Sequence, residues 1–210
     1  MTRLHQEDFC QAMRLPPHTK YQDEGGTSLN QCFDLLDSRI QQGFMAGRNK
    51  VTFLRGVMFN YLIGNGDAHG KNFSLLYNGE EESLAPFYDL MCTLVYGDSY
   101  KGKMAMKIGS KYKFNDMSLR QFDKVAEMIS YKPSFVRKQF ADLAKKIAVE
   151  SVNLADSLNK NPATVRWSWF VGQESGEVKL QILGLSLVYV MPLVSCFVSA
   201  GAGRIVSAEP

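Results

Sequence analysis

A polar segment spanning residues 65 to 74 contains the side chains of this sequence that are best suited to catalysis. It reads Asn-Gly-Asp-Ala-His-Gly-Lys-Asn-Phe-Ser and lies between two apolar stretches, the usual position of an active-site loop on a rigid scaffold. Asp67 and Asn72 stand five residues apart in it, and a second aspartate, Asp89, ends the later stretch Ala-Pro-Phe-Tyr-Asp. An Asp and an Asn at this spacing arise easily by chance, so the argument depends on the whole segment together with Asp89.

These three residues have the order of the catalytic groups in a kinase loop. There, the first aspartate orients and deprotonates the acceptor hydroxyl, and the asparagine and later aspartate hold Mg²⁺ on the phosphates of ATP. The pattern therefore predicts Asp67 as catalytic base and Asn72 and Asp89 as metal ligands. Lys71 lies between them, and its ammonium can neutralise the γ-phosphate; a solvated surface lysine is the alternative. For Asp67 the alternative is an Asx-type turn, which would leave Asp89 unexplained.

The ten-residue segment, together with residues 85–89, resembles the C-terminal, kinase-like domain of the HipA family, bacterial serine/threonine kinases of toxin–antitoxin modules. The similarity extends to residues 3–11 (Arg-Leu-His-Gln-Glu-Asp-Phe-Cys-Gln), to the Leu-Pro-Pro at 15–17 and to the Lys-Tyr at 20–21. It covers residues 1 to about 161. The resemblance implies transfer of the ATP γ-phosphate to a Ser or Thr of a protein substrate, with Mg²⁺, and a DNA-binding antitoxin as partner.

The resemblance also assigns roles within the segment. It implies that Asp67 and Lys71 are catalytic and that Asn72 and Asp89 bind the metal. It also implies that four residues contact the nucleotide: His69, Lys71, Asn72 and Asp89. The family pattern places a histidine two residues after the aspartate as a brace for the loop. We therefore favour bracing for His69 over a role as base or metal ligand, because a lone histidine without partners at ligand spacing is weak evidence for a metal.

The parts that bind nucleotide in kinases have no counterpart in this sequence. Kinases need a glycine-rich loop over the phosphates, a strand lysine and an adenine-binding hinge. Gly25-Gly26 precedes Ser28, but no Gly-Lys-Ser/Thr and no G-x-G-x-x-G is present, so we interpret the pair as a turn before a helix capped by Thr27 or Ser28. We expect the family's N-terminal half to be missing and the chain to be weakly active alone, with a separate polypeptide supplying that lobe. The alternative is a non-catalytic remnant that binds an antitoxin.

The apolar periodicity predicts a mainly α-helical protein with a small β-hairpin, an α+β fold similar to the C-terminal lobe of a protein kinase. A capping box of Ser118 and Gln121 is expected to open one helix, and Pro133 to begin the next. The turn of the hairpin contains three glutamates, which we interpret as a solvated tip. The expected helices are residues 6–13, 29–42, 50–63, 118–129 and 133–158, and the expected strands are 73–77, 84–87 and 104–109.

Composition excludes several other classes of protein. With 210 residues and 45% hydrophobic content, the chain can bury one good core. The net charge of +3 comes from mixed signs without a block of Lys and Arg, so no direct binding to nucleic acid is expected. Four scattered cysteines show neither disulfide nor zinc spacing, and the N-terminus is polar. A cytoplasmic protein with reduced thiols is therefore predicted.

The sequence changes character near Asn161-Pro162, where we divide it into a HipA-like domain, residues 1–161, and an atypical apolar tail, residues 162–210. No residue between Lys179 and Arg204 is charged. Three interpretations remain open for this tail. It is a transmembrane helix, although Gly184 and Pro192 interrupt the required twenty or so apolar residues; it is a packed core segment; or it is out-of-frame sequence joined to an interrupted domain.

Overall fold

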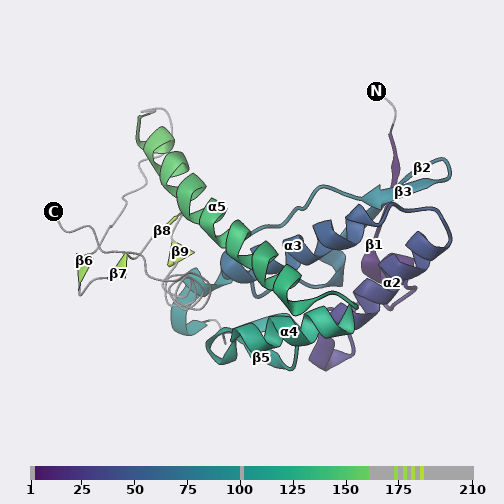
Figure 1. Cartoon of the computed structure of the whole chain (residues 1–210), viewed down its shortest axis with the longest axis horizontal. Coiled ribbons are helices and arrows are strands. Elements are labelled where there is room, and N and C mark those ends of the chain that lie inside the picture. The colour runs from purple at the N-terminus through teal and green to yellow at the C-terminus, as the bar shows by residue number, and fades with distance from the viewer. Residues whose placement is uncertain are drawn as a thin grey trace. The chain divides into compact units, whose positions relative to one another are not determined.

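The computed structural model describes residues 3–99 and 102–160, and four two-residue strands beyond them (Figure 1). Backbone contacts divide the chain into two units, Met1–Arg137 and Lys138–Pro210. The first unit contains every predicted site residue. Helix α5 (Pro133–Lys160) begins in it, at the predicted proline, and continues into the second.

In the second unit, the described strands form two short antiparallel pairs. One pair is β6 (Gln173–Glu174) with β7 (Glu177–Val178), and the other is β8 (Gln181–Ile182) with β9 (Leu185–Ser186). Most of residues 162–210, on which the three interpretations of the tail depend, lies outside the described residues, and the boundary near residue 161 stays a prediction. No helix in the described part of the chain is long and apolar enough to cross a membrane.

Two of the predicted helices are present in the first unit, and both bury apolar side chains in its core. Helix α2 (Leu29–Gln41) begins at Ser28, whose hydroxyl accepts a bond from the backbone N–H of Gln31, while the Gln31 side chain accepts the backbone N–H of Ser28. Helix α3 (Arg48–Leu62) has ten of its 15 residues buried, so it is covered on most sides. A helix covered in this way is a rigid support for the loop that follows it.

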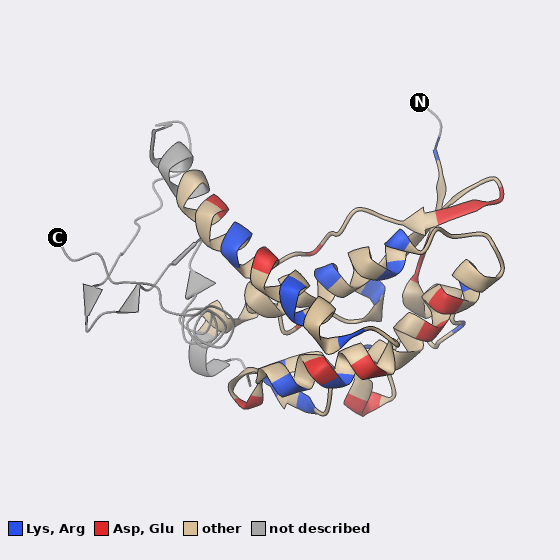
Figure 2. Ribbon diagram, in the orientation of Figure 1, with Lys and Arg blue, Asp and Glu red and all other residues tan. Residues whose placement is uncertain are grey.

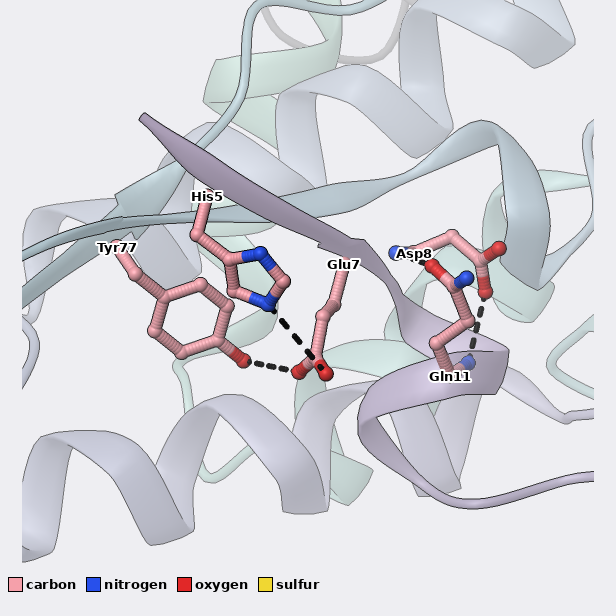
Figure 3. Close-up of polar contacts among 5 residues, drawn as sticks. All are labelled: His5, Glu7, Asp8, Gln11 and Tyr77. Atoms are coloured by element: carbon pink, nitrogen blue, oxygen red, sulfur yellow. Dashed lines mark hydrogen bonds and ion pairs between the residues drawn. The ribbon is translucent and has the colours of Figure 1, made fainter. Parts of the chain in front are cut away.

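The prediction of an N-terminal helix over residues 6–13 is wrong for the first half of that range. Residues 5–8 instead form strand β1 (His5–Asp8), which pairs antiparallel with β2 (Ser74–Asn78); β3 (Glu81–Leu84) completes a sheet of order β1-β2-β3. Asp8 ends the strand and caps the four-residue helix α1 (Phe9–Ala12) through reciprocal bonds with Gln11 (Figure 3). The pairing with β2 satisfies backbone groups that a longer helix would have paired locally.

Figure 3 also shows how side chains support this pairing across the sheet. The Tyr77 hydroxyl donates to Glu7 at 2.7 Å, and the ring of His5 lies 5.4 Å from that of Tyr77. The contact of His5 with Glu7, at 3.7 Å, is an ion pair only if the imidazole is protonated. The bond from Tyr77, on β2, to Glu7, on β1, adds a side-chain link to the backbone ladder.

The predicted hairpin is present, but its return strand, expected over residues 84–87, is wrong: β3 covers residues 81–84, and the tip is only partly solvated. Asn78 pairs with Glu81, so the turn is Gly79 and Glu80, with Gly79 at φ 64°. The side chain of Glu82 is 8% exposed and lies 3.5 Å from the guanidinium of Arg39 on α2. The expectation that all three glutamates are solvated is therefore wrong for Glu82, because alternate residues of a strand point to opposite faces.

A cluster of buried phenylalanines joins the helices to the sheet. The ring of Phe53, on α3, lies 5.3 Å from that of Phe9 and 4.9 Å from those of Phe33 and Phe73. All four side chains are at most 2% exposed. Phe73 lies between the polar residues 65–72 and strand β2. The cluster therefore anchors one end of the predicted catalytic loop.

The C-terminal part of the first unit contains a second hairpin and a further helix. Strand β4 (Lys103–Ile108) pairs with β5 (Lys111–Lys113), and α4 (Leu119–Met128) follows. The expected capping box of Ser118 and Gln121 is wrong, because the Ser118 side chain makes no capping bond. The Gln121 side chain instead accepts bonds from the backbone and hydroxyl of Ser110, each at 3.0 Å, and so connects α4 to the hairpin.

Candidate active site

The predicted catalytic loop leaves helix α3 through a Schellman motif. Gly64 adopts φ 75° and donates its N–H to the carbonyl of Tyr61, and Asn65 donates its N–H to the carbonyl of Asn60 at 2.8 Å. The loop then runs through a single turn of 3₁₀ helix, Gly70–Asn72, into β2. Both ends of the loop are therefore fixed by regular secondary structure.

The backbone of the loop is also held from two other directions. Gly66 donates its N–H to the hydroxyl of Thr93 at 2.9 Å, and that hydroxyl donates to the carbonyl of Gly64 at 3.1 Å. The Gly66 carbonyl accepts the N–H of Ala105, on β4, at 2.7 Å. These bonds set the position of the residue just before Asp67.

The structure brings Asp89 back beside Asn72, as the sequence predicted. The Asn72 side-chain amide donates to Asp89 Oδ2 at 2.6 Å, and the Asn72 carbonyl oxygen Oδ1 accepts the backbone N–H of His69 at 3.0 Å. Asp89 itself has φ 55°, in the left-handed region that non-glycine residues seldom adopt and that aspartate tolerates better than most. The surrounding contacts must therefore stabilise its backbone.

Asp67 is half-buried in the same loop and accepts a hydrogen bond that the sequence did not predict. The hydroxyl of Tyr21 donates to Asp67 Oδ1 at 2.6 Å. Tyr21 belongs to a segment 46 residues earlier in the chain, and its ring also meets that of His69 edge-on, with centroids 6.1 Å apart. The Lys-Tyr pair at 20–21 was noticed as part of the resemblance, but its spacing from Asp67 gave no indication of contact.

A second role that the sequence did not predict belongs to Asn65. Its Oδ1 accepts the backbone N–H of Asp67 at 3.1 Å, and its Nδ2 donates to the backbone carbonyl of Asp89 at 3.1 Å and to Asn60 Oδ1 at 2.7 Å. The glycine that follows an apolar helical run indicates a Schellman end, but no local pattern shows where the next side chain will bond. Through Asn65, the loop of Asp67 and the segment of Asp89 share one buried contact.

His69 is buried, at 5% exposed, and its Nδ1 makes no hydrogen bond with any described residue. Burial lowers the pKa of its imidazole, and the nearby Asp67 carboxylate opposes this only in part. The ring is therefore neutral at pH 7. Its packing against Tyr21 and the bond from its backbone to Asn72 agree with a bracing role, while Nδ1 remains a polar atom that a ligand could engage.

The structure does not place the Lys71 ammonium at the Asn72–Asp89 pair. Its Nζ donates to the backbone carbonyl of Pro17, and no hydrogen bond among the described residues joins it to Asp67, Asn72 or Asp89. The Lys71 carbonyl accepts the Tyr88 hydroxyl at 2.5 Å, which places the residue before Asp89 against the loop. To act on a nucleotide, the Lys71 ammonium would have to break its bond to the Pro17 carbonyl and bond to a phosphate oxygen instead.

The oxygen donors of Asn72 and Asp89 fit a hard divalent cation. Mg²⁺ is commonly held by one or two protein oxygens together with substrate phosphates and waters. Asn72 Oδ1 keeps a second lone pair beside its bond from His69. Among the described residues no group of three His, Cys, Asp or Glu side chains could hold a metal by itself, so a cation here would depend on the phosphates.

Comparison with known proteins identifies the family of the chain. The family model of the HipA-like C-terminal domain matches residues 1–152. The chain belongs to this family. The kinase-named protein Y4mE of Sinorhizobium fredii is 35% identical over 184 residues, which cover 87% of this chain and 43% of Y4mE. The serine/threonine-protein kinase toxin HipA of Shewanella oneidensis is 27% identical over 156 residues, covering 69% of this chain and 35% of HipA.

In the solved structure of the Shewanella oneidensis HipA, HipB and operator DNA complex, part of one chain has the same fold as this HipA-like chain. The TM-score is 0.64 at 22% identity, and the match covers 94% of this chain and 44% of the solved one. The expected α+β fold is thus confirmed. This HipA-like chain spans less than half the length of both relatives and of the solved chain.

Gly56, on α3, allows the segment that carries Asp89 to approach this HipA-like site. An added Cβ would lie 2.4 Å from Cζ of Phe87, two residues before Asp89.

Replacing a glycine inside a helix with alanine normally raises the stability of the protein by about 1 kcal/mol. Here we expect Gly56→Ala to lower the free energy of unfolding by about 1–3 kcal/mol, as overpacking does, in urea denaturation. Gly47→Ala, where an added Cβ meets nothing within 4 Å, is the control and should change little. A stabilised Gly56→Ala would show that Phe87 moves aside freely.

Proposed function

We propose that this chain is the catalytic lobe of a serine/threonine protein kinase, transferring the γ-phosphate of ATP to a hydroxyl of a protein substrate. The main support is the 2.6 Å bond between Asn72 and Asp89, which unites the two candidate metal ligands next to the loop that carries Asp67. The kinase names of the relatives support the same reaction.

Asp67 acts as the base in this proposal. An acceptor hydroxyl hydrogen-bonded to its carboxylate would lose its proton to Asp67 while its oxygen bonds to the γ-phosphorus and the bond to the ADP oxygen breaks. Asp67 Oδ1 already accepts a hydrogen bond from the Tyr21 hydroxyl. A carboxylate can accept about four hydrogen bonds, so its second oxygen is available to the hydroxyl of the protein substrate.

Asn72 and Asp89 would hold Mg²⁺, which neutralises phosphate charge when bound. Lys71 would add a second positive charge once its ammonium leaves the Pro17 carbonyl, because a charge-assisted bond to phosphate is stronger than a bond to a neutral carbonyl. The unpartnered Nδ1 of neutral His69 would contact the nucleotide. The residues proposed to bind the nucleotide are therefore His69, Lys71, Asn72 and Asp89.

The chain alone is proposed to transfer phosphate weakly. Its sequence contains no glycine-rich phosphate loop, and each charge-assisted bond so lost is worth roughly 1.5–3 kcal/mol. A separate polypeptide supplying the nucleotide lobe would restore these contacts.

Incubation of the purified chain with radiolabelled ATP and Mg²⁺, with and without the N-terminal half of Y4mE, tests both claims. We expect little transfer alone, more with the added half, and a fall of about 10²–10⁴-fold in that complex on Asp67→Asn. Asp34→Asn, on the exposed face of α2, is the matched control and should leave the rate unchanged. Strong transfer by the chain alone that vanishes in Asp67→Asn would refute only the weak-activity proposal. Transfer that survives Asp67→Asn would refute the assignment of the base.

A non-catalytic module that binds an antitoxin is the second candidate. The observation that favours it is the solved complex of the Shewanella oneidensis HipA with HipB and operator DNA, which has the same fold. Direct contact with DNA is not proposed for this chain, since its net charge of +3 comes from residues of both signs; basic and acidic positions both occur along helices α4 and α5 (Figure 2). Co-purification with an antitoxin that survives Asp89→Asn, in a chain without any transfer activity, would favour this role.

A further inference from the structure

Asn65 uses every hydrogen of its side-chain amide in one buried network. Both hydrogens of Nδ2 are donated, one to the Asp89 carbonyl at 3.1 Å and one to Asn60 Oδ1 at 2.7 Å, and Oδ1 accepts the Asp67 N–H at 3.1 Å. The residue is 3% exposed, so water cannot replace these bonds easily. Asn60, 5% exposed, is itself fixed because its amide donates to the Gly56 carbonyl at 3.0 Å within α3.

We propose that Asn65 is a positioning residue that ties the backbone of Asp67 to the backbone of Asp89 and holds both on helix α3. This inference rests on the kinase function proposed above. Asp89 has φ 55°, so its backbone would relax from the left-handed region unless contacts oppose it. The bond from Asn65 to the Asp89 carbonyl is such a contact. Asn65 touches neither reacting atoms nor a metal ligand's carboxylate, and acts through the two residues it connects.

The chemistry of the amide allows the two halves of this tie to be separated. In Asn65→Asp, one carboxylate oxygen still accepts the Asp67 N–H, but no N–H remains for the Asp89 carbonyl, and oxygen faces oxygen there. The bond to Asn60 Oδ1 is lost in this variant and in Asn65→Ala alike, so it does not distinguish the two. In Asn65→Ala, both the Asp67 and the Asp89 bonds are lost. The first variant should therefore release only the segment of Asp89, and the second should release both segments.

Amide hydrogen exchange of the metal-free full chain, followed residue by residue by NMR, is the first measurement. In Asn65→Asp we expect exchange of residues 88–93 to rise about tenfold while the Asp67 amide keeps its protection; in Asn65→Ala both should rise. Asn49→Asp is the matched control. Asn49 is also buried, accepts the Leu84 N–H and donates to the Ala46 carbonyl, so the same change is made away from the site. Equal exchange in Asn65→Asp and the unchanged chain would overturn the proposal.

Binding of Mn²⁺ in the presence of a non-hydrolysable ATP analogue, followed by its EPR signal, is the second measurement. Asn65→Asp should weaken binding about tenfold, as loss of a supporting contact does for other metal sites, although it adds a negative charge. Tighter or unchanged binding would show that Asn65 does not position Asp89. If the unchanged chain binds no Mn²⁺, the proposed metal site fails, and the exchange measurement alone decides whether Asn65 ties the two segments. Thermal unfolding of Asn65→Asp and Asn49→Asp, compared side by side, separates lost stability from lost positioning.

Discussion

Replacing Asp89 with asparagine is expected to weaken Mn²⁺ binding by about 100-fold or more, because changes even to residues behind the ligands cost 10–100-fold in affinity at other metal sites. The variant removes the only carboxylate in the proposed ligand pair but keeps the shape of the side chain. Asparagine also tolerates the left-handed φ of 55° that Asp89 adopts, and its Oδ1 can still accept the Asn72 amide. An EPR titration with Mn²⁺, in the presence of a non-hydrolysable ATP analogue, measures the effect.

Asp34→Asn removes the same charge from an exposed position of α2, where the carboxylate accepts a bond from Asn30, four residues before it, and from no other described residue. It should leave Mn²⁺ affinity nearly unchanged. If both variants weaken binding equally, Mn²⁺ responds to the overall charge of the protein and the Asn72–Asp89 pair is not the metal site. Unchanged circular dichroism in both variants shows that the fold is intact.

Replacing Phe53 with alanine is expected to lower the free energy of unfolding by about 3–5 kcal/mol, the usual cost of truncating a buried phenylalanine. Its side chain is fully buried and its ring contacts those of Phe9, Phe33 and Phe73. Domains of this size are commonly stable by only about 5–15 kcal/mol, so much of the stability would be lost. Urea denaturation followed by circular dichroism measures this difference.

Phe44→Ala is the matched control, because Phe44 is 39% exposed and should cost only about 0.5 kcal/mol. A loss below about 1 kcal/mol in Phe53→Ala would mean that neighbouring side chains refill the space and that the cluster does not anchor Phe73. In the expected case the catalytic loop should become more mobile as well, since Phe73 connects it to the core.

The loop combines a rigid base with contacts from distant segments. Helix α3 and the phenylalanine cluster fix its two ends, and Thr93 and Ala105 fix the backbone of Gly66 between them. An active-site carboxylate needs support of this kind, because small displacements remove the alignment on which catalysis depends. Asp67 and Asp89 owe their positions to this support as much as to their own side chains.

The features that the sequence predicted correctly are those set by neighbours along the chain. Helices α2 and α3 follow from apolar residues at spacings of three and four. The cap of α2 was predicted as Thr27 or Ser28, and the structure shows that it is Ser28. The return of Asp89 to Asn72 follows from a short hairpin, whose length limits where the chain can go. The roles of Asp67, His69, Lys71, Asn72 and Asp89 in catalysis and binding stay predictions.

Only the tertiary structure decided the contacts between distant segments. The sequence could not show that β1 pairs with β2, because a strand's partner depends on backbone groups about 70 residues away. It could not show that Tyr21 bonds to Asp67, that Pro17 holds the ammonium of Lys71, or that Asn65 reaches the Asp89 carbonyl. Hydrogen bonds of this kind have no period along the chain, since they depend on how the whole core packs and on which polar groups it leaves to be satisfied.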